Sequence, residues 1–121
     1  MNLKTQERRL DAEFEQLGFQ PHVVHLMAVR PFRGITFAFN PNYPYEEIFA
    51  TQLLKTTLGT IRNREILHWQ TRYVLQQITY FTNSGIAICD PRDNFSRLKG
   101  RVIAKGRLLK WLRQAEEQNS V

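Results

Sequence analysis

The spacing of apolar residues at the start of the chain is typical of an amphipathic helix. These residues follow one another at intervals of seven, four and three, at Leu3, Leu10, Phe14 and Leu17. Positions with these intervals share one face of a helix, so the pattern predicts a helix over residues 3–17. Gly18 can take the left-handed conformation that commonly ends a helix, and Phe19 can then fold back onto the last turn.

The other face of this predicted helix is acidic. It carries Glu7, Asp11, Glu13 and Glu15. Such a face either docks on a basic part of the chain or stays in water, and we expect it to face water.

Two apolar segments after this helix favour a pair of antiparallel strands. Residues 22–29 are rich in β-branched and apolar side chains, and residues 35–39 alternate in size. Pro31 and Gly34 interrupt the pattern between them, so we expect residues 30–34 to join the two strands.

The middle of the chain predicts a second helix and a second hairpin. A dense turn cluster over 40–44 precedes a helix over about 45–58. Aromatic and β-branched residues over 71–82 favour a third strand. The sequence Asn83-Ser84-Gly85 is typical of a tight turn, and residues 86–89 then form the returning strand.

The last predicted element is a basic helix over about residues 94–117, capped by Asp93 or Asn94. The order of elements is therefore α-β-β-α-β-β-α. Antiparallel hairpins combined with helices define an α+β fold. We expect a single small domain over residues 1–121, with an antiparallel sheet of about four strands and helices on one face.

Composition limits the classes of protein that remain. The chain has 121 residues, of which 42% are apolar, so it can bury a core. No apolar run approaches the roughly 20 residues of a membrane span, and residues 1–10 lack the apolar stretch of a signal peptide. Cys89 is the single cysteine, which excludes an internal disulfide and suits a cytoplasmic protein.

Charge is concentrated in one segment near the C-terminus. The chain carries a net charge of +6; residues 91–113 carry +7, residues 1–90 carry +1 and residues 114–121 carry −2. Such asymmetry is typical of a segment that binds polyanionic or acidic partners. The alternative is a basic helix face that only contacts water.

A helical wheel of this segment separates an apolar arc from two basic flanks. The apolar arc contains Phe95, Leu98, Val102, Leu109 and Leu112. Gly106 falls inside this arc and Gly100 outside it. We therefore expect Gly106 to be a packing residue and Gly100 to be open.

The basic flanks supply the candidate binding residues. Arg97, Arg101 and Lys105 form one flank at intervals of four, which we expect to be an exposed shoulder able to contact phosphates. Trp111 lies off the apolar arc and is the best candidate for a partly exposed ring that stacks on a base. The full set of candidate residues for nucleic-acid or partner binding is Arg92, Arg97, Lys99, Arg101, Lys105, Arg107, Lys110, Arg113 and Trp111.

Residues 86–107 also resemble a pattern found in small, mostly uncharacterised phage and mobile-element proteins. The matching positions are Asp93-Asn94-Phe95, Arg97, Gly100-Arg101, Ile103-Ala104 and Gly106-Arg107. The resemblance implies a phage or plasmid setting, in which small basic proteins bind nucleic acid or inhibit host defence systems.

No pattern for catalysis appears in the sequence. There is no nucleophile elbow, P-loop or dinucleotide fingerprint, and the acidic residues near turns and helix starts are explained by capping and the helix dipole. We expect no enzyme, catalytic residue, cofactor or metal. The sequence favours a non-enzymatic accessory protein that binds DNA or RNA through its basic helix. The alternative is an inhibitor, like the anti-CRISPR proteins, that covers an acidic surface of a host defence protein.

Overall fold

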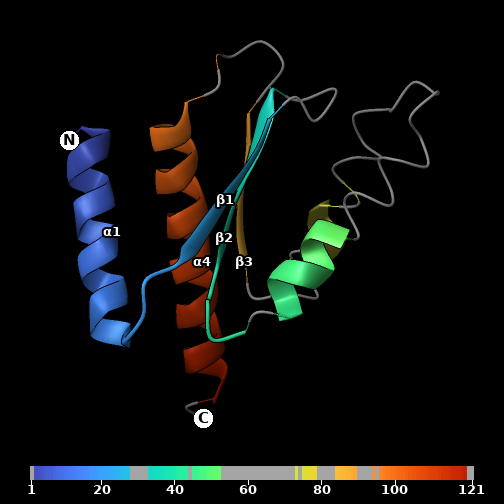
Figure 1. Cartoon of the computed structure of the whole chain (residues 1–121). Helices are drawn as coiled ribbons and strands as arrows, with labels where there is room; N and C mark the ends of the chain where they lie inside the picture. Colours follow the sequence, from blue (N-terminus) through green and yellow to red (C-terminus); the bar gives the residue numbers. More distant parts are fainter. Residues whose placement is uncertain are drawn as a thin grey trace.

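The structure is a computed structural model, and it describes residues 2–27, 33–43, 45–52, 73, 75–78, 84–89, 94 and 96–119. The named elements are α1 (Leu3–Leu17), β1 (His22–Met27), β2 (Gly34–Phe39), β3 (Ser84–Cys89) and α4 (Arg97–Asn119) (Figure 1). Residues 45–52 are also helical, as are residue 73 and residues 75–78. The chain is thus an α+β protein.

Helix α1 begins and ends as its sequence predicts. The side chain of Asn2 accepts a hydrogen bond from the Thr5 N–H at 2.8 Å, which caps the first turn. Gly18 ends the helix with a left-handed φ of 89°. The ring of Phe19 then packs against that of Phe14, with 5.5 Å between the ring centroids.

The three described strands form one antiparallel sheet in the order β1-β2-β3. In this sheet His25 of β1 pairs with Thr36 of β2, and Thr36 pairs with Ala87 of β3. The first two strands confirm the predicted hairpin. Strand β3 agrees with the predicted strand over 86–89 but begins two residues earlier.

The predicted strand over 71–82 is wrong at the residues that the structure describes there. Residue 73 and residues 75–78 are helical, and Leu75 and Ile78 are buried against the sheet. Those two apolar positions are three apart, which suits one face of a helix better than one face of a strand. Strand β3 pairs with β2 instead of with a strand over 71–82. Ser84 and Gly85 therefore lie inside β3 rather than in a hairpin turn.

Helices cover both faces of the sheet rather than the single face predicted. Side chains of Ile35, Phe37 and Phe39 in β2 pack with the helical residues Ala50, Leu75 and Ile78. The opposite face packs on the terminal helices, through Phe14, Ala38, Ala87, Ala104, Leu108 and Leu109. Figure 1 shows α1 and α4 on one side of the sheet and the 45–52 helix on the other.

The final helix begins slightly later than predicted. Ser96, not Asp93 or Asn94, lies directly before α4 and accepts a hydrogen bond from the Lys99 N–H at 3.2 Å. Asn94 is exposed and lies outside the helix, and Asp93 is outside the described residues. Within the described part of the chain, no helix combines the length and apolar character needed to cross a membrane.

Candidate nucleic-acid interface

Helix α4 packs on β3 and β2 through a face that the helical wheel locates only in part. Val102 and Leu109 are buried as expected, and Leu98 and Leu112 are half-buried. Phe95 lies outside the described residues. The remaining buried positions of α4 are Gly100, Ala104, Lys105 and Leu108, so the buried face is rotated toward the flank expected to be exposed.

The two glycines of α4 have roles opposite to those predicted. A Cβ added at Gly100 would lie 2.4 Å from the Thr36 Oγ1 atom and 3.1 Å from its Cβ, so Gly100 packs directly on β2. A Cβ added at Gly106 would meet no atom within 4 Å. Gly106 therefore does not pack within the fold, and the prediction for both residues is wrong.

A third glycine determines how closely α4 approaches the sheet. A Cβ at Gly85 of β3 would lie 1.9 Å from the carbonyl oxygen of Ala104 and 2.6 Å from the Leu108 nitrogen. These are backbone atoms, which cannot move aside as a flexible side chain can. Strand β3 and helix α4 thus touch backbone to backbone, and only glycine fits at position 85.

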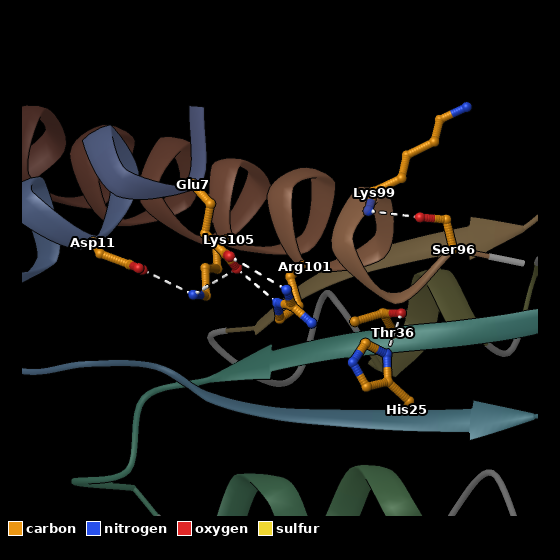
Figure 2. A network of polar contacts seen from close by, with 8 residues as sticks. All are labelled: Glu7, Asp11, His25, Thr36, Ser96, Lys99, Arg101 and Lys105. Carbon is orange, nitrogen blue, oxygen red and sulfur yellow. Dashed lines mark hydrogen bonds and ion pairs between the residues drawn. The ribbon is translucent and has the colours of Figure 1, made fainter. Parts of the chain in front are cut away.

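The flank with Arg101 and Lys105 is covered by acidic side chains of α1. Arg101 donates from Nε and Nη2 to the two carboxylate oxygens of Glu7, at 2.7 and 3.3 Å. Lys105 donates to Glu7 at 3.2 Å and to Asp11 at 2.8 Å. Figure 2 shows the four side chains meeting between the two helices. The acidic face of α1 therefore docks on the basic helix instead of facing water.

This network changes the ionisation of its members. The hydrogen bonds from Arg101 and from Lys105, together with their charges, hold the pKa of Glu7 below its ordinary value despite partial burial. The same contact with Glu7 raises the pKa of Arg101. Only 10% of the Lys105 side chain is exposed, so it is not part of an exposed shoulder.

A histidine lies beside this network at the edge of the sheet. The Nδ1 atom of His25 lies 2.9 Å from the Thr36 hydroxyl, in a partly buried position (Figure 2). Burial lowers the pKa of His25, and the positive charges of Arg97 and Arg101 lower it further. The folded protein therefore favours neutral His25.

The other predicted binding residues fall into two groups. Arg107 and Arg113 are exposed but contact other parts of the protein: Arg107 donates to the Ile86 carbonyl at 2.5 Å, and Arg113 pairs with Glu13 at 2.9 Å. Arg97, Lys99 and Lys110 are exposed, and no described residue forms an ion pair or hydrogen bond with their side-chain charges.

The last two predicted residues are Trp111, which was expected to be partly exposed, and Arg92. Trp111 is half-buried, and Arg92 lies outside the described residues. The structure thus divides the predicted site: Arg101 and Lys105 face α1, whereas Lys99 and Lys110 lie on the solvent side of α4. In Figure 2 the Lys99 side chain extends away from α1 and the sheet.

The sequence patterns did not show that Glu7 and Asp11 determine which basic side chains of α4 stay exposed. A signal for it exists, because Glu7 and Asp11 are four residues apart, as are Arg101 and Lys105. Two such pairs can meet when two helices run side by side, and α1 and α4 run parallel (Figure 1). The relative orientation of the helices, however, is not readable from either segment alone.

Metal chemistry finds no support among the described residues. No three His, Cys, Asp or Glu side chains of that part of the chain lie close enough together to hold a metal ion. His22 and His25 lie on opposite faces of β1, where His22 contacts Glu47 and His25 contacts Thr36. His68 is outside the described residues.

Comparison of the chain with protein-family models, with curated proteins and with solved structures finds no match.

Proposed function

We propose that this protein is a small, non-enzymatic accessory protein that binds nucleic acid through the solvent face of α4. The phage and mobile-element setting implied by the pattern in residues 86–107 is part of the same proposal. We define the solvent face by its exposed cations without a described partner, Lys99 and Lys110, and by Gly106 between them. Arg97 adds charge at the start of the helix.

The observation that carries the proposal is how charge is divided between the two flanks of α4. Acidic groups of α1 neutralise the inner flank, where Glu7 and Asp11 pair with Arg101 and Lys105. No described acidic residue pairs with Lys99 or Lys110 on the outer flank. The outer flank of α4 therefore keeps positive charge that no described acidic residue of the chain neutralises, and a phosphate backbone can contact it there.

The placement of charge along α4 supports the same function. Its first turn contains Arg97 and Lys99 and no acidic residue, although the helix dipole favours anions there. Glu116 and Glu117 lie near its C-terminus, where the dipole favours cations. Charges opposed to the helix dipole weaken the free helix but raise the positive potential at its N-terminal end, as a polyanion-binding surface requires.

The test compares two variants that lose the same charge at different places. Lys99→Gln/Lys110→Gln removes two cations from the solvent face, whereas Arg8→Gln/Arg9→Gln removes two exposed cations from α1. Binding is measured by fluorescence anisotropy with single- and double-stranded DNA and RNA at several salt concentrations. The α4 variant should bind about tenfold more weakly at low salt and reduce the log–log salt slope by about two units.

The Arg8/Arg9 variant serves as the control for net charge and should retain most of the affinity. Equal losses in the two variants would show that binding depends on overall charge and would overturn the localisation to α4. If the wild-type protein binds none of the four probes, the nucleic-acid proposal is wrong, and inhibition of a host defence protein becomes the function to test.

A further inference from the structure

No packing contact within the described structure explains why position 106 of α4 is a glycine. A Cβ at this position would lie in open space, and its φ is not in the left-handed region that favours glycine. A glycine in the interior of a helix makes the helix less stable, by about 1 kcal/mol, than an alanine at the same position. Gly85 and Gly100, in contrast, are each explained by close contact with another element.

The position of Gly106 on the helix relates it to the solvent face. Lys99 lies seven residues before it and Lys110 four residues after it, so the three positions share one side of α4. The two lysines are eleven residues apart, or about 16 Å along the helix axis. The glycine therefore leaves position 106 without a side chain between two cations that pair with no described residue.

We infer that Gly106 lets the sugar-phosphate backbone of a nucleic-acid duplex lie directly against α4, between phosphates held by Lys99 and Lys110. This inference rests on the proposed function and specifies its geometry. The positive charge on either side of the glycine matches a polyanion, and a residue without a side chain is the one that permits close backbone approach. A side chain at position 106 would separate the helix from the strand that the lysines hold.

The test measures thermal stability and duplex affinity, because replacing Gly106 by alanine should raise the first and lower the second. Gly106→Ala should raise the melting temperature of the free protein by about 2–5 °C, because alanine is the better helix former and its methyl group has room. The same variant should bind duplex DNA or duplex RNA more weakly. Gly106→Leu should lose about tenfold in affinity, since the larger side chain holds the backbone away from the helix.

Ala12→Leu is the matched control, because it adds the same side chain at an exposed position of α1, on a different helix from the two lysines. It should bind both duplexes as the wild type does. Duplexes of one sequence, made as DNA and as RNA, show which backbone the face accepts.

The outcomes separate this inference from the proposed function. If Lys99→Gln/Lys110→Gln weakens binding while Gly106→Leu binds as tightly as the wild type, the close approach is wrong and the proposed function stands. If the lysine variant also binds normally, both are wrong. A Gly106→Ala variant that melts below the wild type would show an internal packing role and would overturn the inference by itself.

Discussion

Thr36 lies at the centre of the structure and links three elements through one small side chain. Its side chain is fully buried; its hydroxyl contacts His25 of β1, and its methyl and hydroxyl groups face Gly100 of α4. A larger residue at position 100 would have to displace Thr36 from both contacts. The close fit between α4 and β2 therefore depends on a pair of small residues.

This contact predicts the cost of adding one methyl group. Gly100→Ala should lower the free energy of unfolding by about 1–3 kcal/mol, because the new Cβ overlaps the Thr36 hydroxyl. In a Thr36→Ala background the same substitution should cost less, since the hydroxyl and methyl groups of Thr36 are gone and only its Cβ remains close. Urea unfolding of the four proteins measures this coupling. If Gly100→Ala is as stable as the wild type, α4 does not pack on β2 as described.

At the scale of elements, the local signals in the sequence were sufficient for α1, β1, β2 and α4. Their turn residues and apolar spacing lie within a few residues of each element, so locating them requires no knowledge of the rest of the chain, although the residue that caps α4 is Ser96 rather than Asp93 or Asn94. Residues 75–78 illustrate where this approach fails. Their β-branched and aromatic neighbours favour a strand, but Leu75 and Ile78 are buried as one face of a helix. Tertiary packing overrides a composition that only weakly favours strand.

Two kinds of ion pair join α1 to α4, one partly buried and one exposed, and their contributions to stability can be measured separately. Glu7→Gln should lower the free energy of unfolding by about 1–3 kcal/mol, since it leaves the buried Lys105 with a weakened set of partners. A double-mutant cycle between Glu7 and Arg101 should give a coupling of about 1 kcal/mol or more.

The matched control for this cycle is the pair formed by Glu13 and Arg113, which joins the same two helices but is exposed. Its coupling should be below about 0.5 kcal/mol, because water screens it. Equal couplings for the two pairs would contradict the partly buried network described between α1 and α4.

At the scale of the whole molecule, the sequence located the excess charge but not the surface that presents it. The concentration of positive charge in residues 91–113 is a property of composition. Which of those basic side chains reach solvent depends on the position of α1, whose acidic residues lie 94 to 100 positions away in the chain. The apolar arc of α4 alone therefore identified Val102 and Leu109 correctly but misassigned Gly100, Lys105 and Gly106.

The two lowered pKa values predict how the stability of the molecule depends on pH. For both His25 and Glu7 the unfolded chain binds a proton more readily than the folded protein, so unfolding is favoured as pH falls. The contribution of His25 is complete above its ordinary pKa of 6.5 and is lost below it. The contribution of Glu7 is complete above 4.5 and is lost at lower pH.

Urea unfolding at pH 7.5, at pH 5.5 and at pH 3.5 separates the two groups. His25→Gln should reduce the loss of stability between pH 7.5 and pH 5.5, and Glu7→Gln should reduce the loss between pH 5.5 and pH 3.5. Identical pH profiles for the wild type and both variants would show that neither group is perturbed by folding.

The pairing of α1 with α4 also has a consequence for the order in which the molecule assembles. Helix α1 leaves the ribosome early, but its partners Arg101, Lys105 and Arg113 follow about a hundred residues later. Until then the apolar side of α1 and one face of the β1–β2 hairpin remain uncovered, a state prone to aggregation. Contacts of such long sequence separation also slow folding. The nascent protein therefore depends on the synthesis of α4 to complete its fold.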